Sequence, residues 1–369
     1  MNQCITDADI TSMLKPIDNE KLTGSDLREN ISPESSYQIL RNARTVARNN
    51  ERTAQNEGDL SPINIADWSL ILEKTPSVLT SESKDIELVA WYIEALVRKF
   101  GFPGLTRGFS LARQLIETYG IALYPLPDED GLISQLSALV GLNGFGSEGV
   151  LIYPIKAIAI TQGELPGPLA VWQCEQILDA DRTTDAEKRE AKFRQNGITK
   201  AQLDEVLLET ETPFLQRIKN DIALAIEEYQ RYQTVLDIYS KDDPLPTGQI
   251  LDALENSSKI LFYTAGDRLA KKVIVVEKGK DVVDAVTNTI TTGFISDRGD
   301  ALQRLRDVAD FFRQSEPHSP ISYSIEQVIR WSNLPLTELI KELIPDDSAR
   351  TKYQHLSGID TVKSAKAKT

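Results

Sequence analysis

The feature that most constrains this fold is a run of short amphipathic segments, separated by prolines, near the C-terminus. From residue 300 to 313, apolar side chains recur at three- and four-residue spacing with charges opposite, which predicts a helix. Proline biases the preceding residue away from the α region, so Pro317 and Pro320 separate this helix from a second one, for which Ser319 is the expected N-cap. Pro335 repeats the break before a third apolar stripe. Three short helices are therefore predicted.

Together these helices carry more apolar surface than a unit of roughly 50 residues can bury internally. A second copy of the same chain is the simplest cover, because it presents the same unpaired faces. We therefore predict a helical oligomerisation module over residues 296–360. The apolar side chains expected at its subunit interface are Leu305, Phe312, Ile325, Ile329, Trp331, Leu336, Leu339 and Leu343.

The rest of the chain predicts a mainly α fold. Apolar positions at helical spacing, interrupted by glycine and proline, indicate a helical-bundle N-terminal domain over residues 1–130, in which residues 1–35 form an extended arm. A helical middle region follows over residues 131–268. Residues 269–295 mix lysine, threonine and valine without a helical period and are predicted to be a flexible linker. Residues 361–369 are predicted to be a disordered tail.

One part of the middle region is expected to be less helical than its surroundings. Residues 150–153 and 157–160 are short β-branched and apolar runs, which predicts two short strands in a hairpin.

Composition excludes several classes of protein. The 369 residues are 41% hydrophobic and 26% charged, which is typical of a soluble globular protein. A net charge of −14 argues against nucleic acid and anionic membranes as main partners. No apolar run approaches the roughly 18 residues that a membrane span needs, and no secretory signal opens the sequence. We therefore predict a cytoplasmic protein without direct membrane insertion.

Catalytic and metal-binding patterns are weak. Gly144–Gly149 satisfies the spacing G-x-G-x-x-G, but a nucleotide loop of this kind follows a strand and opens a helix, whereas here a helical pattern precedes it. The two histidines and two cysteines are far apart in sequence and have no metal-ligand spacing. We expect no catalytic residue, no cofactor and no metal. A nucleotide-using enzyme acting through residues 144–149 stays as an alternative that calorimetry with a nucleotide would test.

The C-terminal segment resembles the corresponding end of the TssA proteins of bacterial type VI secretion systems. That family carries a helix ending in an aromatic residue and arginine, a Glu-Pro-x-Ser-Pro break, a helix with Arg-Trp, and a Pro-Leu-x-Glu-Leu segment. The matching residues here are Phe311-Phe312-Arg313, Glu316-Pro317-His318-Ser319-Pro320, Arg330-Trp331 and Pro335-Leu336-Thr337-Glu338-Leu339.

The N-terminal third is similar to the ImpA-type N-terminal domain of the same family. Residues 24–28, Gly-Ser-Asp-Leu-Arg, resemble its opening Gly-Glu-Asp-Leu-Arg motif, with Ser25 in place of the usual acidic residue. Tyr124 is a second departure, at a position where histidine is common. Further matches in the family's order are Asp67-Trp68, Ser83-Lys84-Asp85-Ile86-Glu87, Trp91 and Glu94-Ala95-Leu96.

Four charged residues of these motifs are singled out: Asp26, Arg28, Lys84 and Asp85. In one interpretation they form a partner-docking surface. In the favoured one, Asp26 and Arg28 tether the N-terminal arm to the bundle by charge-assisted hydrogen bonds.

The resemblance implies a non-enzymatic cytoplasmic assembly component that acts at the baseplate and helps to initiate or guide polymerisation of the tail tube and sheath. It implies a homo-oligomeric ring, compatible with a six-fold baseplate, and partners among baseplate, spike, inner-tube and sheath subunits. A distal-end tail cap or chaperone of the same machine is the alternative role. A helical adaptor unrelated to secretion would instead stay monomeric.

Overall fold

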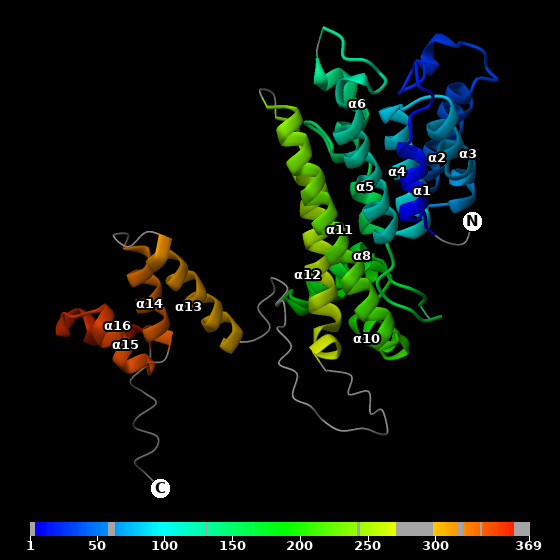
Figure 1. Cartoon of the computed structure of the whole chain (residues 1–369). Helices are drawn as coiled ribbons and strands as arrows, with labels where there is room; N and C mark the ends of the chain where they lie inside the picture. Colours follow the sequence, from blue (N-terminus) through cyan, green and yellow to red (C-terminus); the bar gives the residue numbers. More distant parts are fainter. Residues whose placement is uncertain are drawn as a thin grey trace, which may run out of the picture. The chain divides into compact units, whose positions relative to one another are not determined.

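The computed structural model describes residues 4–57, 63–129, 131–164, 166–241, 244–270, 298–315, 320–332 and 334–357. The chain divides into two compact units, Met1–Val275 and Val276–Thr369 (Figure 1). Within the described ranges the regular structure is helical, with isolated β-bridges in place of a sheet. The predicted mainly α fold is confirmed.

The first part of the first unit consists of α-helices joined by short 3-10 turns. Its elements are α1 (Asp7–Leu14), η1 (Leu27–Glu29), α2 (Ser36–Asn56), η2 (Ile65–Trp68), α3 (Ser69–Ser81), α4 (Ile86–Phe100), α5 (Phe102–Tyr119), η3 (Gly120–Ala122) and α6 (Leu132–Asn143).

The second part of this unit contains two long helices and several short ones. Its elements are α7 (Ile152–Lys156), α8 (Val171–Asp181), α9 (Ala186–Asn196), α10 (Lys200–Glu209), α11 (Thr212–Tyr239) and α12 (Gly248–Ala270).

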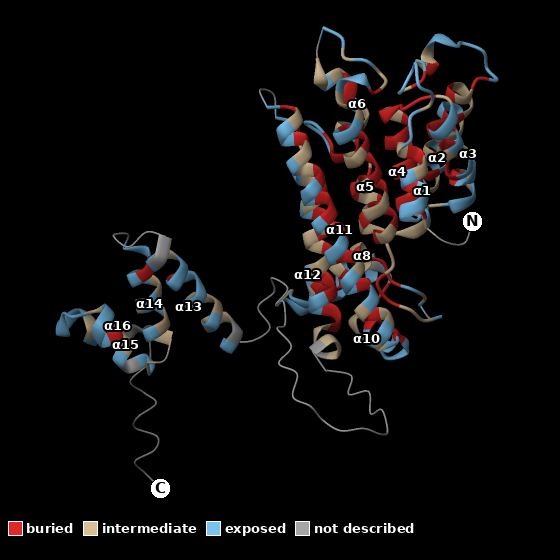
Figure 2. Ribbon diagram, viewed as in Figure 1, coloured by how far each residue is buried: buried red, intermediate tan, exposed pale blue. Residues whose placement is uncertain are grey.

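Helix α4 is the centre of the core. Each residue from Ile86 to Val97, apart from Glu87, is buried, including Glu94. A helix that is buried all round needs neighbours on every side, and α4 contacts α2, α3, α5 and α6. Figure 2 shows this buried centre in red.

Two glycines let α5 approach α4 closely. A Cβ at Gly104 would lie 2.1 Å from the backbone oxygen of Leu96, and one at Gly108 would lie 2.7 Å from Cγ1 of Ile93. No side chain fits at such distances, so the one-turn spacing of these glycines on one face of α5 sets the helix separation.

An aromatic cluster joins α5 to α11. The Phe109 ring stands edge-on to Tyr229 with centroids 4.8 Å apart and lies 4.9 Å from the Tyr232 ring. Beside it, Nε of Arg113 donates to Oε1 of Glu228 at 2.7 Å. Helices from the predicted N-terminal domain and middle region thus share one core, and the boundary between residues 130 and 131 stays a prediction.

The prediction of an extended arm over residues 1–35 is wrong for residues 7–14, which form α1. Thr6 and Asp9 cap one another's backbone amides in a capping box, and Ile10 and Met13 are buried. Two apolar residues in a polar segment are too weak a signal to predict a helix from sequence. Helix α1 is stabilised instead by its contacts with α3 and α5.

The predicted hairpin of strands over residues 150–153 and 157–160 is also wrong. The first run leads into α7, which begins at Ile152, and Pro154 next to it has no N–H to donate to a strand ladder. The second run pairs with residues 169–171: Ile160 N–H donates to the Leu169 oxygen at 2.9 Å, and Val171 N–H donates to the Ile158 oxygen at 3.1 Å.

The second unit contains α13 (Arg298–Ser315), α14 (Ile321–Ser332), α15 (Leu336–Leu343) and α16 (Asp347–Ser357). The first three match the helices predicted from the proline breaks. Helix α16 was missed, although Asp346 after Pro345 is a cap signal: its Oδ1 accepts from the Ala349 amide at 2.7 Å.

Several predictions fall on other parts of the chain. The predicted linker lies outside the described residues from residue 271 onward, as does the predicted tail over 361–369. The break around His318 and Ser319 lies outside them too.

Candidate functional site

Three of the four charged residues singled out from the sequence meet at the start of α4. Arg28 donates to both carboxylate oxygens of Asp85, at 2.7 and 3.2 Å, and to Glu87 at 2.5 Å. Asp26 accepts from the Arg28 amide and from its guanidinium, each at 3.0 Å. Asp85 in turn is the N-cap of α4 and accepts from the amides of Glu87 and Leu88. The network therefore ties η1 to the helix that forms the core.

Asp85 is enclosed, with none of its surface exposed. Burial raises the pKa of its carboxyl, while the hydrogen bonds and charge of Arg28 act in the opposite direction. A bidentate guanidinium is the partner best suited to such a carboxylate, because it satisfies both oxygens in one plane.

Lys84, the neighbouring residue, does not join this network. Its side chain is fully buried, and its ammonium donates to the backbone oxygens of Met13 and Leu79. Burial lowers the pKa of Lys84 to about 8. Lys84 therefore joins the end of α1 to α3 from the interior and presents nothing to a partner.

Backbone pairing explains why the arm lies here. Lys84 N–H donates to the Thr23 oxygen at 2.8 Å and Ser25 N–H to the Glu82 oxygen at 3.3 Å. Gly24 has φ +79°, and a Cβ there would lie 2.1 Å from the Glu82 oxygen. The motif Gly-Ser-Asp-Leu-Arg thus combines a close backbone approach with an arginine that reaches the α4 cap.

A second charged cluster, which the sequence analysis did not assign, lies between α2 and α4. Glu51 accepts from Arg98 at 2.6 and 3.0 Å and from the Trp68 indole at 2.8 Å. The Arg98 guanidinium also stacks 4.1 Å from the Trp68 ring centroid. Only Trp68 stood out in the sequence, because arginine and glutamate on an amphipathic helix normally indicate a solvated face.

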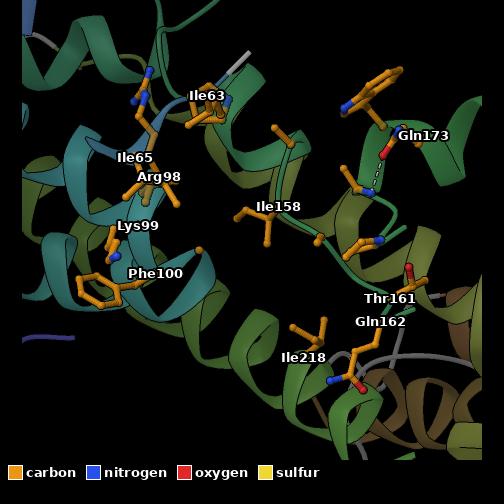
Figure 3. Close-up of a pocket in the computed structure, with 18 of the residues that line it drawn as sticks. Ile63, Ile65, Arg98, Lys99, Phe100, Ile158, Thr161, Gln162, Gln173 and Ile218 are labelled. Carbon is orange, nitrogen blue, oxygen red and sulfur yellow. Dashed lines mark hydrogen bonds between the residues drawn. The ribbon is translucent and has the colours of Figure 1, made fainter. Parts of the chain in front are cut away.

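The first unit also has an apolar groove of about 680 Å³. It is bounded by the end of α4, the loop before η2, α7, the paired segment 158–161 and the starts of α8 and α11. Figure 3 shows Ile63, Phe100, Ile158 and Ile218 around it, with Gln173 at one side. Its lining is aliphatic and aromatic with few polar groups, so it has the character of a packing surface.

The loop Gly144–Gly149 follows the end of α6 in the structure. Gly144 N–H donates to Val140 as the C-cap of that helix, and Gly149 N–H donates to the Gln249 side chain. The free backbone groups at a helix C-terminus are carbonyls, whereas a phosphate requires amides. The loop therefore lacks the strand-to-helix geometry of a nucleotide fingerprint.

The second unit leaves many of its large apolar side chains exposed. Among its described residues, Ala309 and Ile340 are the buried hydrophobics. Leu336 and Leu343 are 56% and 53% exposed, and the other predicted interface residues are partly buried. Further exposed apolar side chains are Val308, Phe311, Ile321, Tyr323, Val328 and Tyr353.

Ion pairs, by contrast, connect the helices of this unit. Arg313 on α13 pairs with Glu326 on α14, and Arg330 on α14 pairs with Glu342 on α15. Exposed pairs of this kind contribute little to stability, so the unit is held mainly by packing between its helices, above all between α13 and α14. Part of its apolar surface nevertheless stays exposed.

Two features of the described residues bear on other functions. No group of three histidine, cysteine, aspartate or glutamate side chains there could hold a metal ion. In the same part of the chain, no helix is both long and apolar enough to cross a bilayer.

Comparison with known proteins gives consistent matches. Residues 14–144 match the family described as ImpA, N-terminal, type VI secretion system. Over 317 residues the chain is 24% identical to the type VI secretion system component TssA1 of Pseudomonas aeruginosa, covering 80% of this chain and 87% of that protein.

A solved structure shares the fold. It is the N-terminal domain, including the conserved ImpA_N region, of the TssA component of the type VI secretion system from Burkholderia cenocepacia. The TM-score is 0.58 at 19% identity, and the match covers 72% of this chain and 99% of that chain. The resemblance that the sequence motifs indicated is therefore confirmed.

Proposed function

We propose that this chain, which is similar to TssA components of bacterial type VI secretion systems, is a non-enzymatic assembly protein whose second unit joins subunits into a ring. In this proposal the ring acts at the baseplate, where it helps to initiate or guide polymerisation of the tail tube and sheath. The first unit, with its ImpA-type domain, is then the part that contacts other components of the machine.

The observation that carries the proposal is the uncovered apolar surface of α13–α16. Eight large apolar side chains there are between 40% and 64% exposed. Burying a large apolar side chain completely stabilises by about 1.5–3 kcal/mol, so covering the exposed halves would yield on the order of 10 kcal/mol per subunit. That is a substantial driving force for self-association even after the entropy lost on binding.

The interface can be tested with side chains whose replacement barely affects the isolated subunit. Leu336 and Leu343 lie seven residues apart on one exposed face of α15, so Leu336→Glu/Leu343→Glu should leave the helices folded and dissociate the ring. Lys352→Glu is the control, because it shifts the net charge equally from an exposed position on α16. Light scattering and circular dichroism would be measured for each. A double variant with the solution mass of the parent would contradict the proposed interface.

The proposed partners are baseplate, spike, inner-tube and sheath subunits. They would be tested one at a time by co-purification with the full-length ring and with the Leu336→Glu/Leu343→Glu variant. We expect the ring to retain at least a baseplate subunit and the dissociated variant to retain less, because a ring presents several copies of each weak contact. Failure of the intact ring to retain any of the four would contradict a role in assembly.

A further inference from the structure

Helix α2 carries a stripe of arginines in a chain whose net charge is strongly negative. Arg41, Arg44, Arg48 and Arg52 follow one another at three- and four-residue spacing, which places them on one face of the helix. From Arg41 to Arg52, eleven steps along the helix, the stripe extends about 16 Å. Arg41 and Arg52 are exposed, while Arg44 and Arg48 are partly exposed.

The charges of this stripe are only partly compensated inside the molecule. Arg44 donates to Oε1 of the buried Glu94 at 2.7 Å, whereas Arg48 lies 3.9 Å from its Oε2. Glu94 also faces Arg98 on its own helix at 3.8 Å, and Arg98 is already paired with Glu51. Two carboxylates therefore face several guanidiniums.

Unused hydrogen-bonding groups lie at the same place. Within the described ranges the Arg48 side chain makes no hydrogen bond, its nearest carboxylate oxygen being 3.9 Å away, and neither Arg41 nor Arg52 has an ion pair. Burial lowers the pKa of Arg48, as do the charges of Arg44, Arg52 and Arg98, with Glu94 opposing. An incoming carboxylate would relieve this repulsion and accept from the free N–H groups of Arg48.

We propose that the arginine stripe of α2 is a docking surface for an acidic segment of a protein partner. Several carboxylates spaced along about 16 Å of a helix or strand would complement it. Carboxylates of a short segment fit better than a nucleic acid, because the net charge of −14 repels an extended polyanion, whereas a short segment within about 8 Å of the stripe is screened from the rest of the chain.

The test uses the full chain and a fluorescein-labelled twelve-residue peptide of alternating glutamate and alanine, measured by fluorescence anisotropy at low ionic strength. Arg41→Gln/Arg52→Gln should weaken binding at least fivefold and leave the fold intact, because neither arginine has an internal ion pair. Arg48→Gln should weaken binding further still when added to this pair. Arg231→Gln/Lys259→Gln is the charge-matched control, since both residues are exposed on α11 and α12, and it should bind the peptide like the parent.

Three outcomes would overturn the proposal. One is absence of peptide binding by the parent at low salt. Another is an equal loss of affinity in the control variant, which would show that net charge alone is responsible. The third is tighter binding of a single-stranded oligonucleotide of the same charge through the same arginines, which would make the stripe a phosphate site. This proposal does not depend on the proposed ring. Peptide affinity tests the arginine stripe, whereas solution mass tests the ring, so either can fail without the other.

Discussion

Replacing Arg28 by methionine tests how strongly the N-terminal arm depends on the buried ion pair. Methionine keeps most of the length and apolar stem but leaves the Asp85 carboxylate, which has no exposed surface, without its cation. Breaking a buried pair from one side costs about 3–5 kcal/mol. Asp85 keeps two amide hydrogen bonds from α4, so we expect the lower end, about 3 kcal/mol of unfolding free energy at pH 7.

The pH dependence of this loss identifies its cause. Burial already raises the pKa of Asp85 in the parent, so the folded state binds the Asp85 proton more tightly than the unfolded state does. The stability that proton binding contributes is lost as pH rises through the folded-state pKa of Asp85. Removing Arg28 raises that pKa further. The destabilisation by Arg28→Met should therefore shrink as pH falls toward the ordinary carboxyl range near 4.

The assay is urea unfolding of parent and variant at pH 7 and pH 4.5, followed by circular dichroism, with Arg28→Lys as the control. Lysine keeps the charge but not the bidentate geometry, so its loss should lie between those of parent and methionine. A loss below about 1 kcal/mol at pH 7, or one that stays constant on acidification, would refute the reasoning.

Three further predictions concern the first unit. Gly104→Ala should cost about 1–3 kcal/mol of unfolding free energy, because the new Cβ would strike the backbone of α4. Gly141→Ala has no atom near its Cβ and should stabilise the protein by about 0.5–1 kcal/mol. Thermal midpoints of the two variants that move in the same direction would argue against this packing. Glu51→Gln should cost about 2 kcal/mol and change the fluorescence of Trp68, because the charge-assisted bonds to Arg98 weaken; an unchanged spectrum and stability would contradict it. The pKa of Lys84 is about 8 in the folded state and near 10.4 in the unfolded state, so the unfolded state holds more protons between these pH values. The stability of the parent should therefore rise relative to that of Lys84→Met between pH 8 and 10, by at most roughly 3 kcal/mol. Parallel pH profiles of the two proteins would exclude the shift.

The helices with long apolar periods were predictable from sequence, whereas short or polar elements were not. Helix α4 combines a continuous apolar period with a cap at Asp85, and both signals are local. Helix α1 has two buried side chains in a polar segment and depends on tertiary contacts, so its eight residues looked like an extended arm. Helix α7 was mistaken for a strand because β-branched residues carry a strand signal that Pro154 should have outweighed.

The candidate sites show the same division. The contact between Arg28 and Asp85 could be anticipated only through the family motif, since 57 residues separate them and no local rule pairs them. The charged cluster of Glu51 and Arg98 could not be anticipated, because the burial of these side chains depends on how α2 and α4 pack. For the second unit, spacing alone gave three of the helices, and the excess of apolar surface followed from its small size.

The central claim, that the second unit assembles this chain into a ring, is tested most directly by the solution mass of the full-length protein at micromolar concentration. Multi-angle light scattering should give a large oligomer, and the same measurement on residues 1–270 should give a monomer or a small oligomer, because the first unit has a core of its own. A monomeric mass for the full-length protein, or a truncated protein with the same number of subunits as the full-length one, would contradict the account.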